Sequence, residues 1–300
     1  MLLLLFTSID PAFILQFIRE QDPRPMNSSS FTGDLTVSLR YLAVGENSAV
    51  VRPSIGGGDS ASEEGVYETR SVKMRSARSM ETSLDREGFF LANQQTQVTD
   101  FFSETEIASI YEKELQSLLT DITGAKRVEI FDHTRRASSI DTQRQHGIRE
   151  PAATIHNDYD DASGPRRLRD FFPQEAEALA KNRFAIINIW RSMNGPVSNF
   201  PLALCDASSV ADEDLVSVPR VSKDRVGTVQ MATFNPSHRW CYYPHMQMNE
   251  ALLFKVYDSA NDGRAKFTPH TSFEDPRVKD ATSAGRQSIE SRCFVFWSSA

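Results

Sequence analysis

Cysteine is scarce in this sequence, and its spacing excludes two kinds of stabilised domain. The 300 residues contain three cysteines, Cys205, Cys241 and Cys293, which are odd in number and include no Cys-x-x-Cys pair. Such a set predicts neither a disulfide framework nor a thiolate zinc site. It is typical of proteins of the reducing cytosol, so we expect a cytoplasmic location.

The sequence also lacks an excess of basic residues and a long apolar run. Lysine and arginine number 33 against 40 acidic residues, which gives a net charge of −7. Nucleic acids and anionic membranes both attract clustered basic residues, so neither is an expected partner. The run from Leu2 to Phe6 is too short to span a bilayer. We predict that residues 1–30 form an N-terminal extension, whose apolar part packs within the chain or on a second copy in a homodimer.

A phosphate-binding loop is missing as well, although three glycines stand together at Gly56 to Gly58. No Gly-Lys-Ser/Thr follows them, as a Walker loop requires. Residues 53–66 are rich in Gly, Ser and acids, which predicts a mobile loop. The length of the chain fits one large domain, and we place it at residues 31–300.

One segment has a clear helical pattern. Residues 103–121 begin with a capping box of Ser103 and Glu106, and Gly124 is a plausible end. Apolar residues recur through this segment at helical spacing, which indicates core packing. A second, shorter helix is expected at residues 170–182, in "DFFPQEAEALAKN".

After residue 124 the pattern changes to short apolar or alternating segments separated by turn residues. Eight such segments are candidate strands: "RVEIFD", "AATIH", "FAIINIWR", "PLALCD", "VGTVQMATF", "RWCYY", "ALLFKVYD" and "RCFVFW". A parallel sheet would need long helices between them, so the series favours a β-sandwich or jelly-roll barrel. The expected fold class is mainly β with flanking helices.

The stretch "PAATIHNDYD" places His156 and Asp158 two positions apart at the end of an apolar run. Residues i and i+2 of a strand share one face, so both side chains can point into the mouth of a barrel. Two histidines and one carboxylate form the facial triad that binds Fe(II) in non-haem oxygenases. A second histidine is then needed. His270, in "KFTPHTSFEDP", is the favoured candidate, and His238 and His245 are the alternatives.

A 2-oxoglutarate co-substrate would need a buried cation for its far carboxylate, and the guanidinium fork of arginine fits one best. The segment "GRQSIESRCFVFW" offers Arg286 and Arg292, and Ser288 shares a strand face with Arg286. Either arginine is a possible anchor. The alternative is that both are rim charges that pair with Glu290 or Asp275.

Several bulky or polar residues are candidates for a substrate pocket, and no catalytic acid–base pair is required beyond the metal centre. The pocket candidates are Arg191, Trp240, Tyr242, His245 and Met246. The competing interpretation is that the aromatic residues only pack the barrel.

Several long motifs together resemble one family. "HNDYD", "IINIWRSMNGPVSNFPLALCDASSV", "NPSHRWCYYPHMQMNEALLFKVYDS", "PHTSFEDP" and "RQSIESRCFVF" are similar to the fungal AsaB-type hydroxylase/desaturase family, which is related to the cephalosporin 7α-methoxylase and gibberellin desaturase group. The likeness covers about residues 70 to 297.

The resemblance implies a cupin-like double-stranded β-helix. It also implies Fe(II)/2-oxoglutarate-dependent oxidation of a small secondary metabolite by O2 through a ferryl intermediate, with hydroxylation, desaturation or ring closure as outcomes. Residue by residue, it places the metal ligands on His156, Asp158 and His270 and the Arg-x-Ser-Ile-Glu block on residues 286–290. Two other functions stay open: an iron oxidase or isomerase of this fold that works without 2-oxoglutarate, and a cupin-like binding protein.

Overall fold

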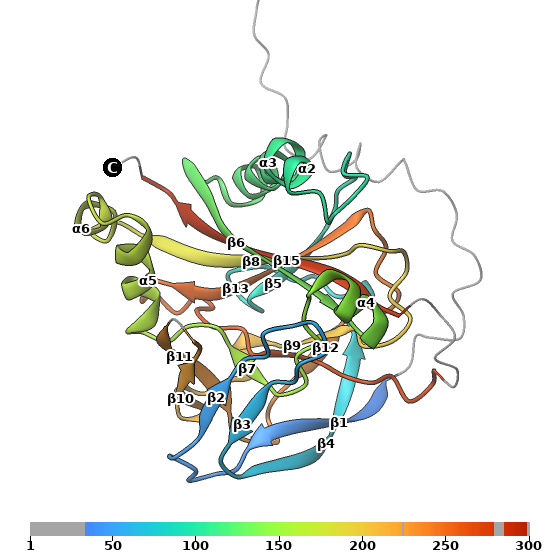
Figure 1. The fold of residues 1–300 in the computed structure, drawn as a ribbon. Coiled ribbons are helices and arrows are strands. Elements are labelled where there is room, and N and C mark those ends of the chain that lie inside the picture. Colours follow the sequence, from blue (N-terminus) through green and yellow to red (C-terminus); the bar gives the residue numbers. More distant parts are fainter. Residues whose placement is uncertain (1–33, 224, 279–284, 299–300) are drawn as a thin grey trace, which may run out of the picture. The chain divides into compact units, whose positions relative to one another are not determined.

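The computed structural model describes residues 34–223, 225–278 and 285–298, and the predicted extension at residues 1–30 lies outside them. Two β-sheets face each other, and the helices lie at their outer side and ends (Figure 1). The predicted mainly β class with flanking helices is confirmed.

The larger sheet contains ten strands, most of them antiparallel to their neighbours. Its strand order is β1-β4-β12-β9-β14-β7-β11-β10-β2-β3. Only the β4–β12 and β10–β2 neighbours are parallel within the described chain. The bounds in chain order are β1 Leu35–Leu42, β2 Val50–Arg52, β3 Ser62–Glu64, β4 Tyr67–Ser76, β7 His156–Asn157, β9 Leu202–Cys205, β10 Leu215–Val221, β11 Val226–Ala232, β12 Trp240–Tyr242 and β14 His270–Ser272.

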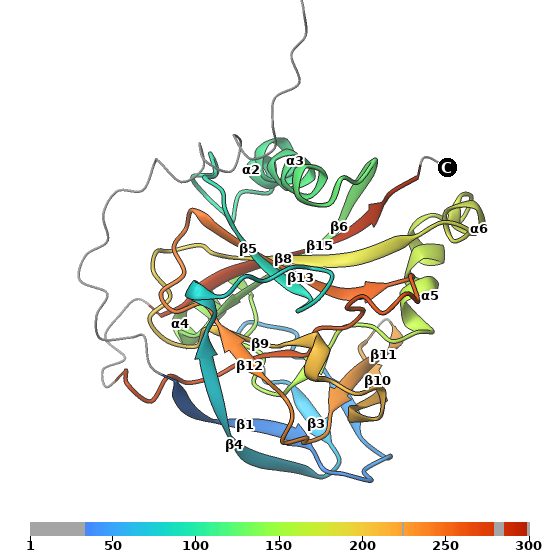
Figure 2. The same cartoon turned by 180° about the vertical axis from the view of Figure 1, so that it is seen from behind.

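The smaller sheet has five antiparallel strands in the order β5-β13-β8-β15-β6. Figure 2 shows this sheet from behind, between the larger sheet and the longest helix. Its strands are β5 Phe89–Asn93, β6 Arg127–Ala137, β8 Phe184–Ser192, β13 Glu250–Asp258 and β15 Gln287–Phe296.

The helical segment predicted at residues 103–121 forms as expected. The Ser103 side chain accepts a hydrogen bond from the Glu106 amide, and Gly124 ends the helix in the left-handed conformation with φ 67°. The segment is α2 (Glu104–Glu106), a π-helical turn (Ile107–Tyr111) and α3 (Glu112–Thr123). The other helices are α4 (Ile140–His146), α5 (Ser163–Phe171) and α6 (Ala176–Leu179), with short 3-10 turns at Ala77–Ser79, Ala207–Ser209 and Asp212–Asp214.

The second predicted helix, at residues 170–182, differs from the structure. Helix α5 begins earlier, at Ser163, and ends at Phe171. Pro173 follows closely, and a proline disfavours helical backbone at the residue before it. Only the four residues of α6 are α-helical beyond it. No helix in the described part of the chain is long and apolar enough to cross a membrane.

Strand alternation divides the apolar residues of the smaller sheet between two layers. Ile186, Phe294 and Phe296 face the larger sheet and form the core between the sheets. Ile187 and Val295 face the opposite way and pack with α3. Because neighbouring residues of a strand point to opposite faces, every strand of this sheet contributes to both layers.

Candidate metal centre

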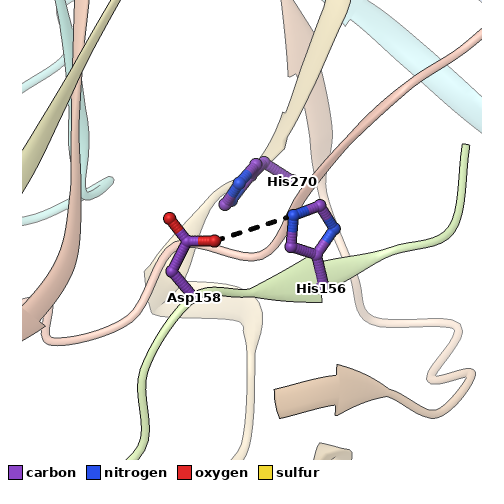
Figure 3. A group of neighbouring side chains, drawn as sticks. All are labelled: His156, Asp158 and His270. Atoms are coloured by element: carbon purple, nitrogen blue, oxygen red, sulfur yellow. Dashed lines mark ion pairs between the residues drawn. The ribbon is translucent and has the colours of Figure 1, made fainter. Parts of the chain in front are cut away.

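Three potential ligands converge between the two sheets. His156 and His270 are directly opposite each other on the paired strands β7 and β14, and Asp158 follows β7 by one residue. Their ligand atoms all lie within 4.8 Å of one another (Figure 3). The His156 Nε2 and Asp158 Oδ1 atoms are 3.8 Å apart. Strand pairing thus brings together residues that are more than a hundred positions apart in the sequence.

Backbone carbonyls orient both imidazole rings. His156 Nδ1 lies 2.9 Å from the carbonyl oxygen of Thr154, and His270 Nδ1 lies 2.9 Å from that of Thr268. A carbonyl can only accept, so each Nδ1 carries a proton and donates it. Each Nε2 then has a free lone pair and faces the centre. Such bonds fix the tautomer and the ring direction in metal sites.

One oxygen of Asp158 is held by the protein, and the other faces His156. Oδ2 accepts hydrogen bonds from Arg292 Nε and Asn188 Nδ2, each at 2.9 Å. Asn188 lies on β8, a strand of the opposite sheet. The carboxylate is therefore oriented from across the barrel, and Oδ1 is left to act as a single-oxygen ligand.

Electrostatics keep all three groups in the protonation state that a metal needs. Burial and the nearby His270 ring lower the pKa of His156 to about 4. Burial also lowers the pKa of His270. Burial would raise the pKa of Asp158, but Arg292 and the two histidines lower it well below its usual range. At neutral pH the site holds two neutral imidazoles and one carboxylate, so it can bind iron without first losing a proton.

A narrow pocket adjoins the two histidines and contains Arg286. Its lining includes His156, His270, Trp190 and Arg286. Arg286 is 6% exposed and donates to the Phe200 carbonyl, while its buried Nε has no hydrogen-bond partner. Burial, with repulsion from another arginine, lowers the pKa of Arg286 to about 9. A buried guanidinium with an unused donor fits a carboxylate ligand.

Arg292, the other candidate anchor, has a different set of neighbours. Besides Asp158, it donates to Asp132 at 2.6 Å and to Glu290 at 2.7 Å. The pairing with Glu290 is one of the predicted alternatives, although the two side chains are only 14% and 9% exposed and so do not lie on a rim. Ser288 is buried on the same face of β15 as Arg286. The two arginines are thus distinguished by their partners, and only Arg292 is already paired with acids.

A second, larger cavity of about 880 Å³ opens beside the metal ligands. His156 and Asp158 line it, together with Tyr159 from the next turn of the chain. Its volume lies within the range typical of sites for small organic molecules. His156 therefore separates a narrow pocket from a wide one, with the proposed metal position between them.

Most of the predicted substrate-pocket residues lie elsewhere. Arg191 points away from the interior and donates to the carbonyls of Gln94 and Met248. Trp240 and Tyr242 pack on the outer face of the larger sheet, where Trp240 donates to the Tyr41 hydroxyl. Neighbouring residues of a strand point to opposite faces of the sheet, and Cys241, between these two, is the residue of β12 that faces the interior.

The remaining pocket and ligand candidates also lie outside the triad. Met246 is buried in the core between the sheets, beside Trp190. His245 has left-handed backbone, with φ 51°, and lines neither cavity. His238 bonds Asp214 at 3.0 Å, which is a structural role. Of the histidines considered as the distal ligand, only His270 reaches the site.

Two kinds of site residue have little or no signal in the sequence. Asn188 orients Asp158, and its signal was a polar residue within the otherwise apolar run "FAIINIWR". Arg136, Arg149 and Arg220 line the large cavity from three separate segments, and no motif links them.

Comparisons with known proteins identify the family of this chain. The model of the family described as "Oxidoreductase/YMDC permease-like domain" matches residues 39–296. The chain is 34% identical over 255 residues to the hydroxylase/desaturase CTB9 of Cercospora beticola, and the matched region covers 77% of this chain and 78% of that protein. It is also 34% identical over 255 residues to the hydroxylase/desaturase efuI of Hormonema carpetanum, covering 77% and 85%.

Two further comparisons concern the predicted family and fold. The hydroxylase/desaturase asaB of Aspergillus flavus is 43% identical over 137 residues, which are 41% of this chain and 60% of that protein. The solved structure of the iron and alpha-ketoglutarate-dependent endoperoxidase NvfI superimposes with a TM-score of 0.75 at 22% identity, over 89% of this chain and 99% of that one. The predicted resemblance and the jelly-roll fold are both confirmed.

Proposed function

This chain belongs to the oxidoreductase family whose model covers residues 39–296, and we propose that it is an Fe(II)/2-oxoglutarate-dependent oxygenase of a small organic molecule. The hydroxylase/desaturases CTB9 and efuI belong to the same family. The observation that carries the proposal is the triad of His156, Asp158 and His270, whose donors face one another and are oriented by neighbours. Two imidazoles and one carboxylate are the ligand set of Fe(II) oxygenases.

The residues of the triad would hold the metal, and they line the two cavities: His156 lines both, Asp158 the large one and His270 the narrow one. Fe(II), 2-oxoglutarate and O2 supply the oxidising chemistry by which a substrate is hydroxylated, desaturated or cyclised. The chain supplies orientation: Thr154 and Thr268 fix the rings, and Asn188 with Arg292 fixes the carboxylate. No further acid or base is needed.

The narrow pocket is the proposed site of 2-oxoglutarate. Arg286 offers a buried guanidinium with an unpartnered Nε, and Ser288 lies two residues along the same strand face. A carboxylate bound there would take a charge-assisted hydrogen bond from the guanidinium and one from the hydroxyl. The large cavity then receives the organic substrate, on the other side of His156.

The location and domain organisation of the protein are further parts of the proposal. Cys205, Cys241 and Cys293 are all buried and free, which supports the predicted reducing, cytoplasmic location. A single oxygenase domain over residues 31–300, preceded by an extension, is likewise our proposal. The predicted homodimer through residues 2–18 concerns a segment outside the described residues.

Anaerobic calorimetry on the full-length chain tests the proposal. We expect 2-oxoglutarate to bind the wild type in a 1:1 ratio only when Fe(II) or Mn(II) is present, and not to bind the His156→Ala variant. On admission of O2, the Fe(II)-loaded wild type should form succinate. A protein that takes up the metal but ignores 2-oxoglutarate would instead be an oxidase or isomerase of this fold. One that binds neither would be a binding protein, and both results would overturn the proposal.

A further inference from the structure

The large cavity beside the metal ligands carries an excess of positive charge. Eight arginines and four acidic residues line it, although the whole chain has a net charge of −7. A concentration of arginine in one cavity of an acidic protein is therefore not a consequence of composition. Arginine forks bind carboxylates and phosphates through paired hydrogen bonds.

The acidic residues of the cavity do not neutralise all of these arginines. Glu63 pairs with Arg40, while Asp132 and Asp158 both pair with Arg292. The fourth acid, Glu150, forms no ion pair in the described part of the chain; its Oε1 accepts a backbone amide, and its Oε2 has no hydrogen-bond partner. The acids of the cavity thus pair with only two of its eight arginines, Arg40 and Arg292, in the described part of the chain.

Three arginines of the cavity form no ion pair with an acid of the described residues: Arg136, Arg149 and Arg220. Arg136 donates only to the carbonyl oxygen of Glu150. The other two have neither a hydrogen bond nor an ion pair from their side chains in that same part of the chain. Each of the three side chains is at least partly buried. Water can therefore solvate their charges only in part.

The three arginines come from separate segments that the fold brings together. Arg136 is on β6, and it forms an isolated parallel bridge with Arg149, which lies between α4 and β7. Arg220 is on β10 and lines the same cavity. Burial lowers the pKa of each, and repulsion from Arg136 and Arg220 lowers that of Arg149 further.

The remainder of the lining suits an organic molecule. Val229, Met231 and Tyr159 are almost fully buried in the protein and border the cavity. The cavity therefore combines a few apolar side chains with three arginines that form no ion pair within the described residues. Arg136 also borders the narrow pocket, so it lies between the proposed co-substrate site and the wider space.

We propose that the substrate of this enzyme is an organic oxyanion, a carboxylate or phosphate ester with an apolar body, whose anionic group is bound by Arg149 and Arg220 while its body reaches the metal ligands. The inference rests on the proposed function, since it names the class of molecule that the same site oxidises. Binding of the oxyanion relieves the repulsion among the arginines and replaces the water that their burial removed. Neutral molecules of the same shape leave these charges without a partner.

A matched pair of fluorescent probes tests this proposal on the full-length, Mn(II)-loaded protein with saturating 2-oxoglutarate. The probes are 1-anilinonaphthalene-8-sulfonate, an apolar anion, and N-phenyl-1-naphthylamine, which has the same rings without the sulfonate. We expect the anion to bind at least about tenfold more tightly, the factor expected of one charge-assisted hydrogen bond. Tighter binding of the neutral probe would overturn the proposal, because that is the order expected of an uncharged apolar cavity.

Substitutions then locate the anion. The double variant Arg149→Gln, Arg220→Gln should weaken binding of the anionic probe at least about tenfold and change that of the neutral probe less than about twofold. Arg225→Gln is the matched control, since Arg225 lines the same cavity but is paired with Asp170 at 3.3 Å. It should change neither affinity by more than about twofold. Equal losses in the control and the double variant would contradict the assignment to Arg149 and Arg220.

Three readouts keep the result interpretable. If the glutamine variant fails to melt cooperatively, the Arg149→Lys, Arg220→Lys variant retains the charge and should retain the preference for the anion. Displacement of the bound probe by acetate or by methyl phosphate shows which oxyanion fits better, and displacement by neither would overturn the proposal. Metal-dependent 2-oxoglutarate binding is measured in parallel on the wild type, so a failure of the proposed function is seen separately from a failure of the anion preference.

Discussion

The two ends of the barrel interior differ sharply, and a single strand shows the difference. The inward face of β15 is charged or polar through its first half, with Ser288, Glu290 and Arg292, and aromatic in its second, with Phe294 and Phe296; Arg286 directly precedes the strand. The first half lies beside the metal ligands and both cavities. The same backbone thus serves a functional end and a packing end.

The aromatic end is closed by side chains alone. Phe294 is fully buried, and its ring lies 4.6 Å from that of Phe131 and 5.5 Å from that of Phe172. Such contacts stabilise the fold without any requirement for charge or protonation. The charged end instead buries groups that interact favourably only when each has a partner. We infer that the aromatic end provides the stability that allows the other end to hold ligands in an unfavourable setting.

The largest expected effect is the loss of a metal ligand at the charged end. His270→Ala should lower the affinity for Fe(II) more than about 100-fold, since even residues that only orient a ligand contribute 10–100-fold. Succinate formation should be lost with it. Anaerobic equilibrium dialysis measures the metal. His133→Ala is the control, because His133 bonds Ser291 and Glu112 instead of the triad, and an equal loss there would contradict the assignment.

At the aromatic end, the expected loss is stability and not metal affinity. Phe294→Ala should lower the free energy of unfolding by about 3–5 kcal/mol, because it leaves a cavity among packed rings. Phe171→Ala removes the same side chain from a position that is 39% exposed, and it should cost less than half as much. Urea unfolding measures both. If the folded Phe294→Ala variant lost as much metal affinity as His270→Ala, the two ends of the interior would not be separate.

The proposed 2-oxoglutarate anchor gives a smaller and more specific effect. Arg286→Gln should raise the KM for 2-oxoglutarate by about 10- to 100-fold, as the loss of a charge-assisted hydrogen bond predicts. Arg286→Lys should raise the KM less, because lysine keeps the positive charge. In both variants the Fe(II) affinity should stay within a few-fold of the wild type. Steady-state succinate formation measures the KM. An unchanged KM in the glutamine variant would place the co-substrate elsewhere.

The smallest effect concerns pH and the metal-free protein. The pKa of His156 is about 4 in the folded chain, and an unfolded histidine has about 6.5, so between these values only the unfolded chain takes up the proton. Stability should therefore fall as the pH falls, by about 2 kcal/mol from this group between pH 7 and pH 5. Urea unfolding of wild type and His156→Gln at both pH values measures it. The same dependence in both proteins would contradict the assigned pKa.

The three residues of the proposed metal centre could be singled out from the sequence because each lies in a short recognisable pattern. His156 and Asp158 share a face at i and i+2, and Pro269, directly before His270, favours extended backbone at the residue that precedes it. What the sequence could not show was that these strands pair in a register that sets His156 directly opposite His270. Register depends on contacts between distant segments.

Alternation along a strand predicts which residues share a face but not which face lies inside. Trp240 and Tyr242 are candidates for the pocket by sequence, with packing as the alternative, and they pack on the outer face of the sheet, since Cys241 is the inward residue of β12. Arg286 and Arg292 share one face of β15, so only their partners distinguish them. The arginines of the large cavity come from unrelated segments, and no local pattern joins them.

The number of Fe(II) ions bound per chain, measured by anaerobic dialysis in the presence of 2-oxoglutarate, tests the central claim most directly. The wild type should bind one ion per chain, and the Asp158→Ala variant should bind none at the same free metal concentration. Equal binding by both proteins, or none by the wild type, would contradict a metal centre formed by His156, Asp158 and His270.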